Sequence, residues 1–237
     1  MQRIFAAIIL AGSALAFSGC RSDVISHDPP ANDNLVAIQT AKTLDAPAAR
    51  PVNDHRPLLV CFGDSLTAGL GADEGQTYPD FLQRDLDRDG YHYRVVNEGV
   101  SGDTTKDGVD RLADVVALKP AVVVLEFGGN DGLRGFKVDT TRGNLATMIT
   151  ALKGAGAKVV LAGMTLPPDY GPDYVNAFTA NYPMLGRKYD LPVLPFLLQG
   201  AYGVDGMIQR DGIHATDKGN EVVANNVLPL VERLLRK

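Results

Sequence analysis

The stretch LLVCFGDSLTAG, residues 58–69, joins an apolar run to a serine that is flanked by glycines. The run from Leu58 to Phe62 is typical of a β-strand that is buried on both faces. A serine directly after such a strand can hold its hydroxyl in a tight turn that opens a helix, whose N-terminus favours a developing negative charge. The segment matches neither the G-x-S-x-G elbow nor a phosphate loop. On this segment alone, a nucleophile and a helix-capping serine are equally consistent with Ser65.

Apolar runs and helical spacing alternate along the rest of the chain. The runs predict strands at residues 58–62, 94–96, 121–126, 158–162 and 192–195. The segments between and after them predict helices at residues 78–88, 105–118, 141–153, 174–189 and 217–235. This alternation predicts a central, mainly parallel sheet with helices on both faces, which is a three-layer α/β/α sandwich. We expect it to form one domain over residues 56–237.

Residues suited to catalysis follow several of the predicted strands. In open α/β sheets, ligands bind outside the carboxyl ends of the strands. Besides Ser65, these exits hold Gly102, whose N–H can approach a substrate closely, and Asn130, whose amide is a donor. Asp211 precedes His214 by three residues, so it can accept from Nδ1–H and leave Nε2 as a base. A turn or a surface histidine explains each feature alone, but together they supply a nucleophile, a base, an orienting acid and donors.

These blocks, taken in order, resemble the GDSL (SGNH) hydrolase family: Gly63-Asp64-Ser65-Leu66, Gly102, Gly128-Gly129-Asn130-Asp131 and Asp211-Gly212-Ile213-His214. The similarity covers residues 57–237, and segments 130–135 and 166–171 resemble in particular the bacterial esterase, acyl-CoA thioesterase I and lysophospholipase L1 group. The resemblance implies a flavodoxin-like fold with a five-stranded sheet. It also implies a triad of Ser65, Asp211 and His214, and an oxyanion hole made by the N–H groups of Ser65 and Gly102 and the Asn130 amide. No cofactor and no metal are expected.

Two loops at the same edge of the sheet are candidates for substrate binding. Residues 166–176 and 197–210 carry apolar side chains that suit an acyl chain. The residues predicted to bind substrate are Leu166, Pro167, Tyr170, Met207 and Ile208, with Leu198 and Tyr202 beside them. The alternative is that these side chains only pack the loops onto the domain. We expect hydrolysis of short-to-medium acyl esters and thioesters.

Three other functions are compatible with parts of this pattern. A carbohydrate acetylesterase or a lipase would use the same triad, and the sequence does not separate them from an esterase. A binding lipoprotein that has lost turnover would be expected to lack a triad residue, whereas all three are present. A metal site formed from Asp64, Asp103, Asp211 and His214 would make activity sensitive to a chelator.

The first twenty residues indicate export. Arg3 precedes an apolar run, Ile4 to Phe17, that is short for a membrane span. The run leads into Ser18-Gly19-Cys20, which resembles a bacterial lipobox. We expect residues 1–19 to be a signal peptide and Cys20 to be lipidated, which would anchor the protein to a membrane in the periplasm; an ordinary secretory signal is the alternative. Residues 20–55 are predicted to be a flexible linker.

The two cysteines and the net charge indicate the state of the Cys61 thiol and the kind of partner to expect. Cys61 is the only cysteine besides Cys20, and its apolar strand suits a buried, inert thiol. A disulfide between the two is the alternative, and it would require ordering of the tail. The net charge is −5 with no basic block, so a nucleic-acid partner is not expected. We expect a monomer that acts on a small-molecule or lipid acyl substrate.

Overall fold

The computed structural model describes residues 54–237, which fold around a five-stranded parallel sheet. The strand order is β2-β1-β3-β4-β5, the flavodoxin-like order, and each neighbouring pair is parallel. This confirms the predicted fold class. The strands are β1 (Leu58–Gly63), β2 (Arg94–Gly99), β3 (Val122–Glu126), β4 (Lys158–Ala162) and β5 (Val193–Leu194).

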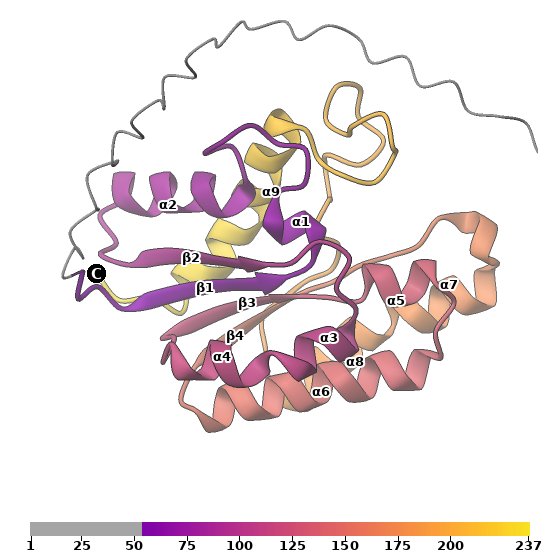
Figure 1. Cartoon of the computed structure of the whole chain (residues 1–237), viewed down its shortest axis with the longest axis horizontal. Coiled ribbons are helices and arrows are strands. Elements are labelled where there is room, and N and C mark those ends of the chain that lie inside the picture. Colours follow the sequence, from indigo (N-terminus) through magenta and orange to yellow (C-terminus); the bar gives the residue numbers. More distant parts are fainter. Residues whose placement is uncertain (1–53) are drawn as a thin grey trace, which may run out of the picture. The chain divides into compact units, whose positions relative to one another are not determined.

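Helices cover both faces of the sheet, as Figure 1 shows. On one face lie α2 (Tyr78–Arg88) and α9 (Asp217–Glu232), which contact each other. On the other lie α3 (Thr105–Asp110), α4 (Leu112–Ala117), α6 (Val138–Gly154) and α8 (Asn181–Tyr189). Three short helices follow the carboxyl ends of strands: α1 (Ser65–Ala68), α5 (Gly129–Leu133) and α7 (Pro172–Thr179), the last preceded by a 3₁₀ turn, η1 (Pro168–Tyr170).

The core lies between the sheet and these two helical layers. Every residue of β1 and of β3 is buried, which explains why these strands read as continuous apolar runs rather than alternating ones. β2 is an edge strand, and its residues are exposed or half-buried. The apolar face of α6 contributes Leu145, Met148, Ile149 and Leu152 to the core.

Two predicted helices are each divided in two. The helix expected at residues 105–118 breaks at Arg111, whose guanidinium turns inward to the Gly63 and Glu98 carbonyls and to Asp103. The helix expected at residues 174–189 begins at Pro172 and breaks at Ala180. Pro183 lacks an N–H, so the Thr179 carbonyl loses its helical partner there. Spacing of apolar residues did not reveal either break.

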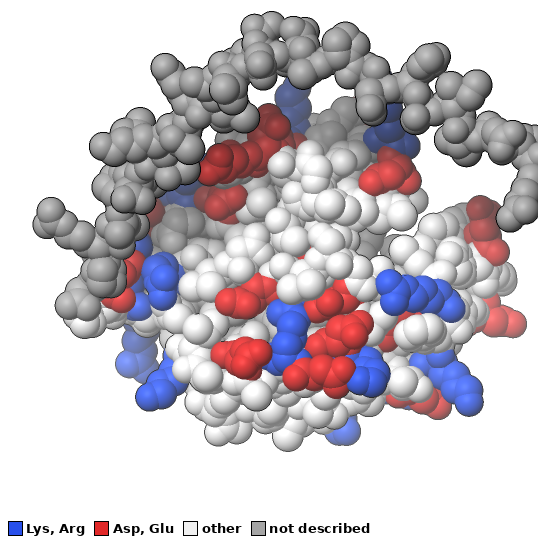
Figure 2. Space-filling view, in the orientation of Figure 1, with Lys and Arg blue, Asp and Glu red and all other residues white. Residues whose placement is uncertain are grey.

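Charged side chains on the face shown in Figure 2 are interspersed rather than separated by sign. Over α3 and α4 they form ion pairs, Lys106 with Asp110 and Arg111 with Asp103. Such pairing leaves this face without a large field of one sign.

Several predictions for the N-terminal region concern residues outside those described. The signal peptide at residues 1–19, the lipidated Cys20 and most of the linker at residues 20–55 lie there. Cys61 is described: it is a free thiol at the centre of β1, and burial raises its pKa to about 12. It is therefore protonated and inert. Among the described helices, none has the length and hydropathy of a membrane span.

Candidate active site

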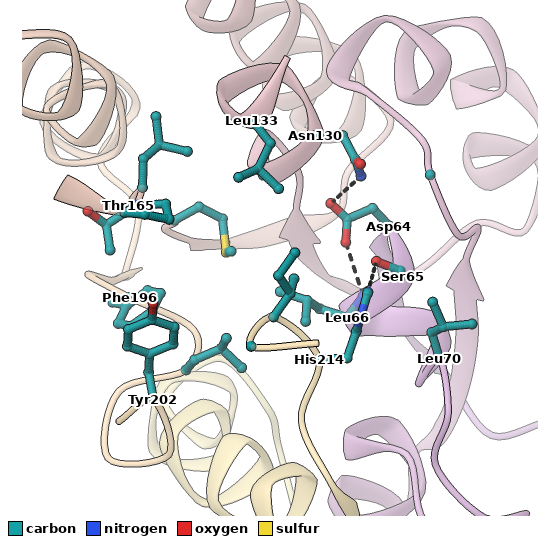
Figure 3. A pocket seen from close by; sticks show the side chains of 18 of the residues that line it. Asp64, Ser65, Leu66, Leu70, Asn130, Leu133, Thr165, Phe196, Tyr202 and His214 are labelled. Carbon is teal, nitrogen blue, oxygen red and sulfur yellow. Dashed lines mark hydrogen bonds between the residues drawn. The ribbon is translucent and has the colours of Figure 1, made fainter. Parts of the chain in front are cut away.

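Ser65 is held at the start of α1, immediately after β1. Asp64 caps this helix, because its Oδ1 accepts from the Leu66 N–H at 3.0 Å. The side chain of Ser65 is largely buried, and its Oγ faces the carboxyl edge of the sheet (Figure 3). As the first residue of a helix, Ser65 also has an N–H that lacks an acceptor within the helix.

His214 reaches Ser65 from the loop that precedes α9. Its Nε2 lies 2.8 Å from Ser65 Oγ, and its Nδ1 lies 2.6 Å from Asp211 Oδ2. The other oxygen of Asp211 accepts from the N–H groups of Ile213 and His214, at 2.9 and 3.0 Å. These two bonds fold the segment back on itself, which is how an acid three residues away can orient the ring. The three side chains form one connected hydrogen-bonded line.

The Asp211 carboxylate is strongly stabilised in its ionised form. Partial desolvation acts to raise its pKa, but the hydrogen bonds from the His214 ring and from two backbone N–H groups outweigh it and lower the pKa to about 2. Its contribution to stability is therefore present above its unfolded pKa and is lost as pH falls toward 2. Asp211 thus remains an anion opposite Nδ1 throughout the neutral range.

The predicted oxyanion donors lie at the same edge as Ser65. Gly102 follows β2 in a left-handed conformation, with φ of +88°, and its N–H donates no hydrogen bond within residues 54–237. Asn130 lies on α5, and its Nδ2 donates to Asp64 Oδ2 at 3.2 Å and to the Asp103 carbonyl at 2.9 Å. Gly102 and Asn130 both line the cavity that Ser65 faces. An oxyanion would therefore share or replace one of the present acceptors of Asn130.

Replacing Asn130 by alanine is expected to lower kcat by about 10²–10³-fold, which is the usual cost of losing one oxyanion donor. The fold should persist, because Asn130 is only half-buried. Steady-state kinetics with circular dichroism would check both points. Asn144→Ala, on α6, is a matched control that removes a half-buried amide away from the cavity. Turnover close to that of the wild type would remove Asn130 from the oxyanion hole.

A second carboxyl group, not anticipated from the sequence, lies beneath the nucleophile. Glu126 ends β3 and is fully buried, and its Oε2 accepts from the Asp64 N–H at 3.2 Å and from Thr67 Oγ1 at 2.8 Å. Its Oε1 has no hydrogen-bond partner among the described residues. Burial raises the pKa of Glu126 well above its ordinary value, and burial likewise raises the pKa of Asp64 to about 6. In the sequence, this buried acid could have been found as a charged residue, Glu126, at the end of an otherwise apolar strand.

The buried acids give folding a defined pH dependence. Because their pKa values are raised, the folded protein retains protons that the unfolded chain has lost above about pH 4, so the free energy of unfolding falls as pH rises. We expect Glu126→Gln to flatten this decline, whose slope is up to about 1.4 kcal/mol per pH unit for each extra proton. Urea unfolding from about pH 5 to about pH 8 would measure it. If the free energy of unfolding fell equally with pH in the wild type and in Glu126→Gln, Glu126 would not change its protonation on unfolding.

A cavity of about 300 Å³ opens beside the Ser65 hydroxyl. Figure 3 shows Ser65 and His214 at one end of it and Phe196 and Tyr202 across from them. Its walls are mostly apolar, and the lining includes Leu70, Leu133, Met164, Leu166, Pro167, Pro168, Phe196, Leu198, Tyr202 and Ile213. A cavity of this size and character fits a short or medium apolar group.

Only part of the predicted substrate-binding set lines this cavity. Leu166 and Pro167 do, whereas Tyr170, Met207 and Ile208 do not. The Tyr170 hydroxyl instead donates to the Leu133 carbonyl at 2.9 Å. Ile208 forms an antiparallel bridge and packs against the core, and the carbonyl of Met207 accepts a backbone hydrogen bond. The Tyr170 and Ile208 side chains thus hold their loops to the domain, as in the alternative considered for them, and Met207 does so through its backbone.

Metal coordination was a competing interpretation of the acidic residues. Within residues 54–237, no three His, Cys, Asp or Glu side chains converge to hold a metal ion. Asp211 is directed to the His214 ring, and Asp103 is paired with Arg111. The carboxylates are thus committed to other partners.

Comparison with known proteins is consistent with this geometry. The model of the GDSL-like lipase/acylhydrolase family matches residues 61–222. The chain is 44% identical over 178 residues to the esterase TesA of Pseudomonas aeruginosa, which covers 75% of this chain and 89% of that protein. It is 36% identical to the thioesterase 1/protease 1/lysophospholipase L1 of Escherichia coli. That match covers 70% of this chain and 79% of the relative. A crystal structure of TesA superposes with a TM-score of 0.73 over 75% of this chain and 99% of that one.

Proposed function

We propose, on the premise that this chain belongs to the GDSL-like lipase/acylhydrolase family, that Ser65, His214 and Asp211 are its catalytic triad. The chain is a carboxylic ester hydrolase. The observation that carries the assignment is the continuous line of hydrogen bonds from Asp211 through the His214 ring to Ser65 Oγ, at 2.6 and 2.8 Å. That arrangement can remove the proton of a serine as it attacks a carbonyl.

The proposed reaction has two halves. Ser65 Oγ attacks the acyl carbonyl carbon while His214 Nε2 takes its proton, and Asp211 stabilises the imidazolium that forms. The oxyanion accepts from the N–H groups of Ser65 and Gly102 and from the Asn130 amide. His214 then protonates the leaving alcohol or thiol, and an acyl-serine remains. A water molecule attacks this ester by the same steps in reverse, so that the acid is released and Ser65 regains its proton.

The proposed substrates are short-to-medium acyl esters and thioesters. The apolar cavity beside Ser65 supports this, because an acyl chain would be removed from water there while the reacting carbonyl remained at the polar end. A carbohydrate acetylesterase would instead need polar groups along the cavity to bind sugar hydroxyls. The relatives bear the names esterase and thioesterase/lysophospholipase, which agree with this class of substrate.

We further propose that the protein is exported, anchored through a lipid on Cys20 in the periplasm, and monomeric. The support is the charged start, short apolar run and lipobox-like end of residues 1–20. Mass spectrometry of the mature N-terminus would distinguish acylated Cys20 from cleavage at another site. Sedimentation of the detergent-solubilised protein would test the monomer.

Hydrolysis of p-nitrophenyl acetate, butyrate, octanoate and palmitate, and of the matching thioesters, tests the proposed activity. We expect the largest kcat/KM at short-to-medium chains, with no loss in EDTA, and covalent labelling of the Ser65 peptide by an alkyl p-nitrophenyl phosphonate. Activity confined to acetylated sugars would refute the substrate class. Labelling of a different peptide would refute the nucleophile.

A further inference from the structure

Asp211 and His214, the acid and the base of the proposed triad, lie on an exposed loop. We call residues 207–216 the base loop, and residues 69–77, which lead from α1 to α2, the nucleophile loop. The side chain of Asp211 is 44% exposed, and that of His214 is 14% exposed. Ile208 and Ala215 pack against the core, whereas the segment between them lies near the surface and yet has to hold His214 within hydrogen-bonding distance of Ser65.

Gln209 makes four of the hydrogen bonds that hold this loop. Its backbone N–H donates to the His214 carbonyl at 2.7 Å, and its carbonyl accepts from the Gly212 N–H at 3.0 Å. Its side-chain Nε2 donates to the Leu70 carbonyl at 2.7 Å and to the Ala215 carbonyl at 2.8 Å. Both amide hydrogens are therefore used, one on the nucleophile loop and one on the residue after the base.

The surroundings leave little freedom to the Gln209 amide. A Cβ atom built on Gly71 would overlap this amide, so the nucleophile loop packs directly against it. A second bond joins the nucleophile loop to the start of α9, from the Asp73 N–H to Asp217 Oδ1 at 3.1 Å. In Figure 1 the purple loop that leaves α1 correspondingly lies beside the yellow start of α9. Gln209 does not line the cavity, so its contacts are with the protein and not with substrate.

We propose that Gln209 is a positioning residue whose side-chain amide fastens the base loop to the nucleophile loop and thereby holds His214 Nε2 at Ser65 Oγ. This inference rests on the proposed function, since it assigns the distance between those two atoms to a third residue. An amide suits the task because its two N–H groups diverge toward two carbonyl oxygens. A side chain of similar length without donors would leave both carbonyls unpaired and the loop free to shift.

The test compares Gln209→Met with Gln199→Met in the full-length protein. Gln199 is exposed on a neighbouring loop and does not line the cavity, so it is the matched control. We expect Gln209→Met to lower kcat on p-nitrophenyl butyrate by roughly 10–100-fold, because small displacements of a catalytic group are costly. KM should stay within about threefold of the wild-type value. The downfield proton NMR signal of His214 Nδ1–H, bonded to Asp211, should broaden in Gln209→Met and stay sharp in the control.

A second variant displaces the amide without deleting it. Gly71→Ala places a methyl group against the Gln209 side chain and also strains the backbone, because Gly71 has a φ of +78°. Gly75→Ala, at a φ of +75° in the same loop with nothing within 4 Å of an added Cβ, carries the same strain without the contact. We expect Gly71→Ala to show the same fall in kcat at constant KM, and Gly75→Ala to keep the wild-type kcat. Wild-type kcat and a sharp NMR signal in Gln209→Met would overturn the proposal, as would a lower Tm with unchanged kcat. Failure of both variants to fold would assign the amide to stability alone and also overturn it. If the wild-type protein hydrolysed no ester, the proposed function would fail, while the NMR comparison would still decide the role of Gln209.

Discussion

Replacing Ser65 by alanine is expected to lower kcat on p-nitrophenyl butyrate by roughly 10⁶-fold, the size of the effect seen when the nucleophile of a serine hydrolase triad is removed. The variant should bind substrate normally, since the cavity walls are unchanged and the lost group is one hydroxyl. It should also fold normally, because Ser65 Oγ bonds only to the His214 ring within residues 54–237. Steady-state kinetics would measure the loss, and titration of reactive serine in the same preparation would set an upper limit on contaminating wild-type enzyme.

The control for this experiment is another hydroxyl. Thr147 lies exposed on α6, where its Oγ1 donates to the Gly143 carbonyl, far in the fold from the cavity. Thr147→Ala should keep full activity. If Ser65→Ala kept activity within tenfold of the wild type, water or another side chain would have to be the nucleophile, and the proposed mechanism would fall.

Asp211→Asn is expected to lower kcat by about 10⁴-fold and to lower Tm as well, because the ionised carboxylate contributes to stability at neutral pH. The asparagine Oδ1 can still accept from the Ile213 and His214 N–H groups, so the turn should persist. Its amide nitrogen, however, would face Nδ1 as a donor. The imidazole would then favour the tautomer that carries its proton on Nε2, which cannot accept the Ser65 proton. The pH dependence of kcat/KM would accompany the rate measurement.

Asp205→Asn provides the comparison, because Asp205 is an exposed acid on the loop that leads to His214 and lies outside the cavity lining. It removes the same charge without touching the ring. Equal losses in the two variants would attribute the effect to net charge near the site. A loss below tenfold in Asp211→Asn would show that the ring is oriented by something else, with Gln209 as the next residue to examine.

The sequence was sufficient to bring the proposed catalytic groups to one edge of the sheet, because the strands that precede three of them were predictable. Ser65, Gly102 and Asn130 come directly after buried or edge strands, and parallel strands end at a common edge. Asp211 and His214 are close in sequence, so a local turn could be inferred. Five strands in alternation with helices then determined the layers.

Contacts between segments far apart in the chain were not predictable in the same way. Gln209 meets Leu70 across 139 positions, and no spacing rule connects a loop glutamine with a carbonyl at that distance. The inward turn of Arg111, which breaks one helix, depends on carbonyls of two strands that only the folded chain brings together. Met207 and Ile208 failed to line the cavity because loop residues of the same apolar character can pack either inward or toward substrate.

The separation of the proposed triad along the chain bears on when the chain can become active. Ser65 and His214 are 149 positions apart, so the base is synthesised long after the nucleophile. Domains fold largely as units during or after synthesis, and contacts of long sequence separation form late. A nascent chain that has emerged only as far as β4 carries the serine but has no base to activate it. With the proposed triad, hydrolytic competence therefore requires synthesis to have passed His214, and chains released before that residue would lack the base.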